Sequence, residues 1–185
     1  MNPPEPSAEP FVDAEPLLQA RARPVARAPV RVDARFMLAR LSRLIALAAG
    51  AGLAPFAAGT VGTLWAWVAF AVGSVWIGPG AWVGIAAVGF AVGVWACGRT
   101  ARDLGVADHG AIVWDEVVAF WLVLAILPAG FGWQAAGFAL FRFFDIVKPP
   151  PIRWFDRNVS GGLGVMADDV VAAFATLLVL AWFAR

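Results

Sequence analysis

Residues 60–97 read TVGTLWAWVAFAVGSVWIGPGAWVGIAAVGFAVGVWAC and contain no charged side chain. The tripeptide Gly78-Pro79-Gly80 divides them into two apolar runs, Thr60–Ile77 and Ala81–Cys97. As helices rising about 1.5 Å per residue, both runs approach the roughly 30 Å thickness of the hydrocarbon core of a bilayer. Because glycine and proline favour turns, the pattern predicts two short membrane helices joined by a tight turn.

Two further apolar stretches follow. Val117–Leu140 is interrupted by PAGFG at 128–132, and Val170–Ala184 precedes Arg185. The interrupted stretch could be one long kinked span or a hairpin of two helices. Only the hairpin places Lys148 and nearly all the arginines on one side of the bilayer, so the positive-inside bias favours it. We expect an all-α, polytopic membrane bundle of four to five short apolar helices, with the functional site at their cytoplasmic ends. The expected helices cover about residues 60–77, 81–97, 115–128, 132–146 and 168–184.

The composition of the whole chain narrows its class. It is 61% hydrophobic and 15% charged, with a net charge of +1 and a mean hydropathy of +0.76. Soluble domains are about 45–50% apolar and about 25% charged, so this composition excludes an ordinary soluble globule. The small net charge gives no basis for nucleic-acid binding. Cys97 is the single cysteine, which excludes an intramolecular disulfide and a cysteine-cluster metal site. Any metal must be held mainly by oxygen.

The N-terminal part has a different composition. Its first 35 positions hold seven of the thirteen prolines and show little apolar periodicity. Such a segment cannot bury enough surface to offset its chain entropy. We predict that residues 1–35 are a disordered, Pro/Arg-rich cytoplasmic tail and that residues 36–185 form a membrane-embedded domain.

A signal peptide is an alternative interpretation of the same region. Arg40 and Arg43 would precede its apolar core, Leu44–Ala54, and the small residues of Pro55–Gly59 would hold the cleavage site. Some forty residues of proline-rich leader argue against this alternative.

Five carboxylates lie close to the ends of the expected helices. They are Asp115 and Glu116 at the third, Asp145 after the fourth, and Asp168 and Asp169 at the last. In the hairpin topology these ends face the cytoplasm, as does Thr60 at the start of the first helix. An ionised group within a membrane segment costs at least about 2.5–3.5 kcal/mol, so such groups usually have a partner or a function. The alternative is that they only sit among the headgroups, with acids favoured at helix N-termini.

The pattern of charges indicates a cation and a phosphate. Clustered carboxylates repel one another and would hold protons unless a cation neutralised them. Oxygen ligands suit Mg²⁺, which proteins bind through one or two carboxylates, water and substrate phosphate. Arg142 lies three residues before Asp145 and shares its helix face, and Lys148 is the single lysine. Backbone amides at 59–63 and 161–164, with the hydroxyl of Thr60 or Thr63, are further potential anion donors.

Missing motifs exclude several phosphatase chemistries. A cysteine nucleophile would need an arginine at position 103, where the chain has Asp103, and histidine-nucleophile lipid phosphatases need more than His109. The chain has no Walker-type loop for a nucleoside triphosphate. What remains is metal-activated water attacking a phosphoryl group.

Four motifs follow one another along the apolar part of the chain. They are GLAP at 52–55 with GTVGT at 59–63, DHGAIVWDE at 108–116, FRFFDIVKP at 141–149 with Pro151 and Ile152, and GGLGVMADD at 161–169. Over roughly residues 44–185 these motifs resemble the bacterial phosphatidylglycerophosphatase A family. The resemblance implies a Mg²⁺-dependent enzyme that removes the terminal phosphate of phosphatidylglycerophosphate to give phosphatidylglycerol. It also implies a multi-pass protein of the bacterial inner membrane, with the N-terminus and the active site cytoplasmic.

The resemblance further implies roles for individual residues. The Mg²⁺-binding and catalytic cluster would be Asp115, Glu116, Asp145, Asp168 and Asp169. We hypothesise that one carboxylate, with Asp168 or Asp169 as candidates, serves as general base for the attacking water. Arg142 and Lys148 would bind the scissile phosphate, helped by Thr60 and its neighbouring amides. His109 is a candidate for protonating the leaving oxygen, although a lone loop histidine is more often structural.

Other functions stay open at this point. A small transporter or ion-conducting protein could also gather carboxylates, but would place them near mid-bilayer along a path. A structural membrane protein would not need the Arg-x-x-Asp-x-x-Lys set, and a lipid phosphotransferase would need room for an alcohol acceptor. The sequence predicts no oligomeric state.

Overall fold

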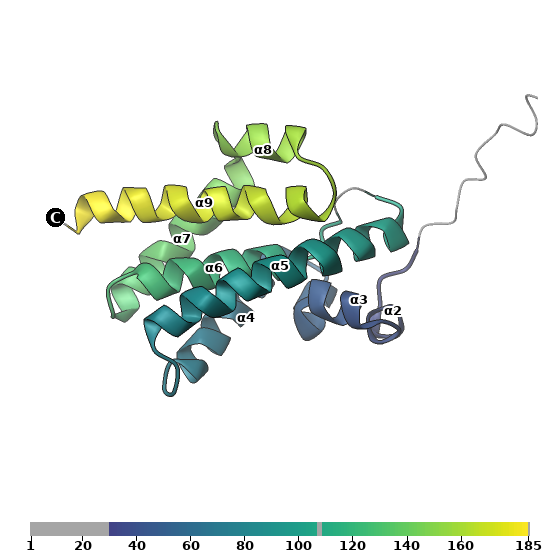
Figure 1. Cartoon of the computed structure of the whole chain (residues 1–185), viewed down its shortest axis with the longest axis horizontal. Coiled ribbons are helices and arrows are strands. Elements are labelled where there is room, and N and C mark those ends of the chain that lie inside the picture. The colour runs from purple at the N-terminus through teal and green to yellow at the C-terminus, as the bar shows by residue number, and fades with distance from the viewer. Residues whose placement is uncertain (1–29, 107–108, 185) are drawn as a thin grey trace, which may run out of the picture. The chain divides into compact units, whose positions relative to one another are not determined.

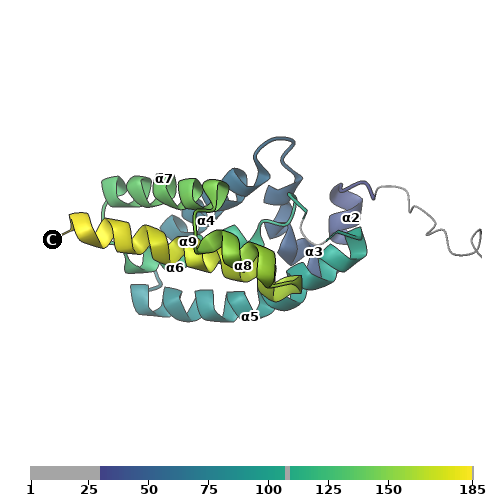
Figure 2. The same ribbon diagram turned by 90° about the horizontal axis from the view of Figure 1, so that it is seen from above.

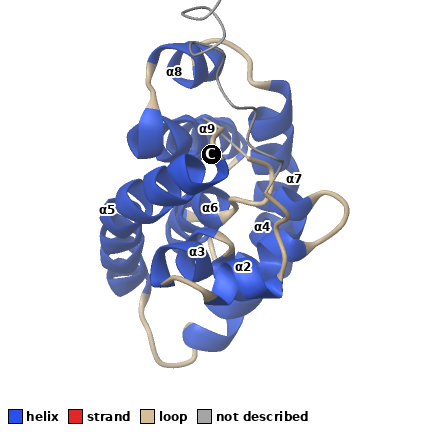
Figure 3. Ribbon diagram, turned by 90° about the vertical axis from the view of Figure 1, so that its right-hand side faces the viewer, coloured by secondary structure: helices blue, strands red, loops and turns tan. Residues whose placement is uncertain are grey.

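The computed structural model describes residues 30–106 and 109–184, and all regular structure within these ranges is helical (Figure 3). The all-α prediction is therefore confirmed. The elements are α2 (Ala34–Leu38), α3 (Leu41–Ala46), the 3₁₀ helix η1 (Ala48–Leu53), α4 (Ala58–Gly73), α5 (Pro79–Leu104), α6 (Trp114–Ile126), α7 (Phe131–Val147), α8 (Ile152–Asn158) and α9 (Gly161–Phe183).

Helix α6 is the core of the helical bundle. Most of its thirteen residues are buried: Asp115, Val117, Val118, Ala119, Phe120, Trp121, Val123 and Leu124. A helix that is apolar on all sides must be covered on all sides. The end-on view of Figure 3 accordingly shows α6 surrounded by α3, α4, α5, α7 and α9. Figure 2 shows α5 and α7 on opposite sides of α6 and α9.

Helices α5 and α9 cross at glycines. A Cβ on Gly98 would lie 2.9 Å from the backbone nitrogen of Gly162, and a Cβ on Gly162 would collide with the carbonyl oxygen of Val94. Gly93 leaves space for the side chain of Met166, whose Cε would lie 2.7 Å from an added Cβ. Small residues at a crossing let two backbones approach closely, as in membrane helix pairs. The α5–α9 pair therefore depends on the absence of these side chains.

Length and hydropathy make α5 and α9 the two described helices that could each cross a membrane, and α4 is a shorter apolar helix (Figure 1). Helix α6, at thirteen residues, rises only about 20 Å, which is less than the hydrocarbon thickness. The number of spans stays a prediction. A break between the first two helices is confirmed, but it lies earlier than predicted. Helix α4 ends at Gly73 rather than residue 77, and Pro79 takes the first position of α5, where its missing N–H is not needed, so Pro79 and Gly80 belong to the helix.

The predicted start of the last helix is wrong. Helix α9 begins at Gly161 instead of residue 168, so Asp168 and Asp169 lie in its third turn. The glycines at 161–164 suggested a turn, but Gly162 and Gly164 are helical residues that pack against backbone carbonyls of Val94 and Val159. Only Gly161, with φ +72°, has the left-handed backbone that favours glycine.

Helix α5 continues seven residues beyond the predicted end at Cys97. Its last two turns are polar and form ion pairs with the start of α3. Arg40, the N-cap of α3, and Arg43 within α3 each place a guanidinium nitrogen 3.0 Å from a carboxylate oxygen of Asp103. Gly105, with φ +74°, ends the helix. Hydropathy alone marked only the apolar part of this helix.

The predicted hairpin within Val117–Leu140 is confirmed. Helix α7 runs back along α6, so that Arg142 near the end of α7 comes within 3.5 Å of Oε1 of Glu116 in the first turn of α6. A single kinked span would have placed these two residues far apart. Gly130, with φ +134°, precedes the first residue of α7.

The N-terminal predictions are tested only in part. Residues 1–29 of the predicted tail lie outside the described residues, and α2 begins within its last residues, at Ala34, where the Asp33 carboxylate accepts a hydrogen bond from Phe36 N at 2.8 Å. Helices α2, α3, η1 and α8 were not predicted, because helices this short are set by packing rather than by periodicity. The proposed signal-peptide core is broken by Ala48 and Ala49, which have positive φ angles.

Candidate active site

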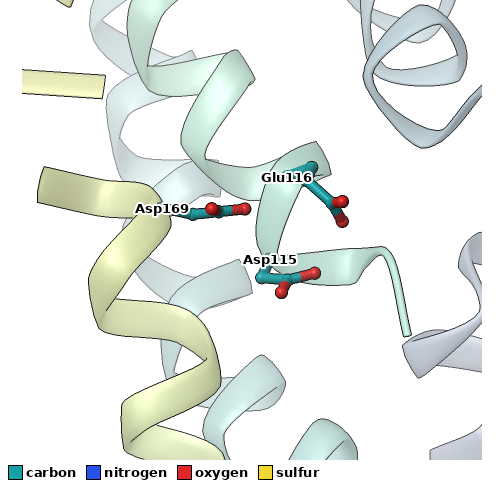
Figure 4. Close-up of side chains that lie close together, drawn as sticks. All are labelled: Asp115, Glu116 and Asp169. Carbon is teal, nitrogen blue, oxygen red and sulfur yellow. The ribbon is translucent and has the colours of Figure 1, made fainter. Parts of the chain in front are cut away.

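Three carboxylates meet between α6 and α9. Asp115 and Glu116 occupy the first turn of α6, and Asp169 extends towards them from α9 (Figure 4). One oxygen of each lies within 4.8 Å of the other two. We call these residues the acid trio. Asp115 is 9% and Asp169 2% exposed.

The acid trio has unused ligand atoms. Asp115 Oδ1, Glu116 Oε2 and Asp169 Oδ2 are buried and accept no hydrogen bond from any described residue. An unpaired buried carboxylate is strongly unfavourable unless it is neutralised by a proton or a cation. Three such oxygens of one chemical type fit a hard divalent cation, and the donor set contains no nitrogen or sulfur ligand.

Arg142 lies beside the acid trio and is held in place from three sides. Its Nη1 is 2.6 Å from Asp145 Oδ2 and 3.5 Å from Glu116 Oε1, and it donates a hydrogen bond of 3.4 Å to Thr63 Oγ1. The Thr63 hydroxyl in turn donates to Gly59 O at 2.9 Å. The i,i+3 pairing of Arg142 and Asp145 is therefore confirmed, and α4 orients the guanidinium.

Lys148 is the second cationic residue of the site. Its Nζ lies 2.5 Å from Asp168 Oδ2 and 2.6 Å from Asp156 Oδ1. Lys148 ends α7 with a left-handed backbone, φ 46°. Burial lowers the pKa of Lys148, but the hydrogen bonds to Asp156 and Asp168 outweigh it and raise the pKa above its usual value. The ammonium group is therefore firmly charged.

The structure divides the five predicted carboxylates into two groups. The acid trio lacks a close cationic partner on three of its oxygens, whereas Asp145 is paired with Arg142 and Asp168 with Lys148. Glu116 and Asp169 also interact electrostatically with Asp145, so the two groups adjoin. Five acids near helix ends thus form one site with two kinds of carboxylate.

Two predicted residues make no hydrogen bond with the charged groups of this site among the described residues. Thr60 is partly exposed in the first turn of α4, and its hydroxyl makes no hydrogen bond with a described residue; Thr63, one turn further, contacts Arg142 instead. His109 accepts a hydrogen bond from Ala111 N at Nδ1 (3.1 Å) and lines a separate cavity of about 390 Å³ next to residues 52–58.

Sequence reasoning missed Asp156, and only weighed Thr63 as an alternative to Thr60. Asp156 lies on α8, a helix too short to show periodicity, and no spacing links it to Lys148. Thr63 donates to Gly59 O one turn earlier in α4, and this local contact gives no sequence signal for the approach of Arg142 from α7.

The fold and the site define a helical, largely apolar protein with a buried carboxylate cluster beside an arginine and a lysine, a donor set suited to a divalent cation and a phosphate. The profile described as Phosphatidylglycerophosphatase A matches residues 44–184. The chain belongs to the phosphatidylglycerophosphatase A family.

Similar proteins come from several bacteria. A protein of Escherichia coli strain K12 named phosphatidylglycerophosphatase A is 46% identical over 130 residues, covering 70% of this chain and 75% of the relative. One of the same name from Haemophilus influenzae is 43% identical over 138 residues, covering 74% and 85%. A protein of Bacteroides thetaiotaomicron, provisionally named a phosphatidylinositol-3-phosphatase, is 38% identical over 150 residues, covering 75% and 90%. No solved structure matches the chain.

Proposed function

We propose that this protein hydrolyses the terminal phosphate monoester of phosphatidylglycerophosphate in phospholipid biosynthesis. Water attacks phosphorus and the P–O bond to glycerol breaks, so that phosphate leaves with the water oxygen and the glycerol oxygen gains a proton. The observation that carries the proposal is membership of the phosphatidylglycerophosphatase A family, with relatives of that name at 43% and 46% identity. The acid trio, which has three buried oxygens without a described partner and lies beside Arg142 and Lys148, supports it, because phosphoryl transfer needs charge stabilisation on the phosphate oxygens.

The acid trio is the proposed Mg²⁺ site. Asp115, Glu116 and Asp169 would each supply a carboxylate oxygen to the ion, and each has one buried oxygen without a partner among the described residues. Bound there, Mg²⁺ would supply Lewis-acid charge against the phosphoryl oxygens and increase the acidity of nearby water.

The remaining charged residues have distinct proposed roles. Arg142, already oriented by Asp145 and Thr63, would bind the scissile phosphate together with Lys148. Asp168 is the proposed general base. Lys148 holds its Oδ2, while its Oδ1 is buried and has no described partner, so that oxygen could accept a proton from water.

Thr60 and the first amides of α4 would assist in binding the phosphate. The start of α4 adjoins the site, because an added Cβ at Gly59 would touch both Glu116 and Arg142. Backbone N–H groups at a helix start are favourable donors to phosphate oxygens.

We also propose a multi-pass location in the bacterial inner membrane, with the N-terminus and the site on the cytoplasmic side. Helices α5 and α9 have sufficient length and hydropathy, and the positive-inside bias orients them. The transporter alternative is not favoured by the relatives' names. The carboxylates of α6 and α7 also lie together, in the first turn of α6 and the last turn of α7. They are not spaced along a route through the bundle.

Phosphate release from purified protein in detergent tests this function. We expect release from phosphatidylglycerophosphate in the presence of Mg²⁺, little after chelation, and recovery on adding Mg²⁺ back. Phosphatidic acid, phosphatidylinositol 3-phosphate and a soluble phosphate ester would report selectivity. Absence of release with Mg²⁺ present, together with ion flux in reconstituted vesicles, would favour the transporter instead.

Gly59→Ala tests whether α4 positions the charged groups. The new Cβ would collide with Glu116 Oε1 and lie 3.0 Å from Arg142 Nη2. Displacing positioned groups by a fraction of an ångström costs rate without unfolding, so we expect roughly tenfold slower phosphate release and nearly unchanged thermal stability. Gly80→Ala is the matched control, since nothing lies within 4 Å of its added Cβ. Equal rates in both variants would contradict the positioning role.

A further inference from the structure

A second polar cavity lies beside the proposed catalytic site, between α8 and the start of α9. It has a volume of about 230 Å³. Asp156 and Arg157 line it from α8, Ser160 and Gly161 from the turn into α9, and Asp168 from the third turn of α9. The cavity is separate from the acid trio, none of whose members lines it.

The hydrogen-bond donors around this cavity are unused. Arg157 forms no ion pair or hydrogen bond with any residue that the structure describes, whereas Arg153 on the same helix donates to Val147 O at 3.4 Å. Ser160 is the N-cap of α9, yet its side chain makes no capping hydrogen bond. An unpaired guanidinium beside an uncapped helix start provides charge and N–H groups for an anion.

The two carboxylates that line the cavity repel an anion only weakly. Asp156 and Asp168 both bond to Nζ of Lys148, which offsets part of their charge. Asp168 is only 6% exposed, and its Oδ1 is buried without a described partner, which indicates that a hydrogen-bond donor such as water or a hydroxyl belongs nearby. Lys148 therefore stands between two polar sites, linked to the cavity through Asp156 and Asp168.

We propose that this cavity binds the second phosphate of the substrate headgroup, the phosphodiester, through Arg157, Ser160 and the first amides of α9. This inference rests on the proposed function. The headgroup of phosphatidylglycerophosphate carries two phosphates joined by a three-carbon glycerol. The monoester lies with Arg142 and Lys148, and the diester lies with Arg157 on the other side of Lys148. Selectivity for a lipid with two phosphates over phosphatidic acid, which has one, arises from this cavity.

The test compares two lipids of equal acyl chains in one detergent. Arg157→Gln should lower kcat/KM for phosphatidylglycerophosphate about tenfold, the usual effect of losing one charge-assisted hydrogen bond, and leave kcat/KM for phosphatidic acid unchanged. Arg153→Gln, on the same helix but outside the cavity, should change neither value. Arg157→Lys should recover part of the loss. An unchanged ratio of the two kcat/KM values in Arg157→Gln overturns the proposal, as does an equal fall on both lipids.

Inhibition by inorganic phosphate shows whether the cavity binds the phosphodiester of the lipid or free phosphate. If Arg157→Gln weakens inhibition by inorganic phosphate but leaves the lipid ratio unchanged, the cavity takes free phosphate and the proposal is wrong. Failure of the proposed function has a different outcome, because wild-type protein would then release no phosphate from phosphatidylglycerophosphate. Wild-type turnover with an unaffected Arg157→Gln variant rejects only the diester site.

Discussion

Asp169→Asn should reduce phosphate release from phosphatidylglycerophosphate by at least about a hundredfold. Asp169 is 2% exposed, and its Oδ2 is among the buried oxygens without a described partner. An amide removes the negative charge that would hold a divalent cation while keeping the shape of the side chain. Even residues that only support a metal ligand change activity or metal affinity by about 10–100-fold, so loss of a ligand should cost at least as much.

Folding and metal affinity must be measured with the same variant. Because Asp169→Asn removes one of three clustered charges, we expect equal or higher thermal stability without metal and weaker stabilisation by added Mg²⁺. Asp103→Asn is the matched control, since Asp103 is paired with Arg40 and Arg43 away from the site. If Asp169→Asn kept wild-type turnover and Mg²⁺ response, the acid trio would not be the metal site.

Gly162→Ala should destabilise the fold, although alanine is the better helix former. The added Cβ would collide with the carbonyl oxygen of Val94 and lie 2.9 Å from Gly98 N. Both contacts are backbone atoms that cannot rotate away, so α5 and α9 must separate. Overpacking of this kind costs about 1–3 kcal/mol. For a chain of this size that corresponds to a fall of roughly 3–10 °C in the midpoint of thermal unfolding in detergent.

For the control variant we expect the opposite change, a rise in stability. Gly84→Ala lies within α5, where no atom comes within 4 Å of the added Cβ. Without a collision, exchange of glycine for alanine in a helix is stabilising by about 0.4–1 kcal/mol. A fall in stability for both variants, or for neither, would show that the α5–α9 crossing does not depend on Gly162.

Local pattern was sufficient to predict the long helices and their hairpin. The charge-free run of residues 60–97 and the break near Pro79 predicted α4 and α5 because hydropathy and turn preference are properties of neighbouring residues. The same logic failed at the start of α9. Gly162 and Gly164 resemble turn residues in sequence, and only their contacts with Val94 and Val159 show that they are glycines for close packing.

The candidate site divides in the same way. Its residue types and the Arg142–Asp145 pair followed from sequence, since a three-residue spacing within one helix fixes which side chains are neighbours. The separation of the acid trio from Asp145 and Asp168 did not follow, because Asp169 meets Asp115 across more than fifty residues of chain.

The sequence by itself determined an apolar helical protein with a few carboxylates, an arginine and a lysine at helix ends, because composition and periodicity are local quantities. Only the tertiary structure decided which carboxylate oxygens are paired and which lack a described partner. Lys148 joins Asp168 to Asp156 on α8, and Arg157 lies beside a cavity with no partner in the part of the chain that the structure describes. These outcomes depend on how α6, α7, α8 and α9 pack together, and distances between helices are not encoded in the spacing of residues along any one of them.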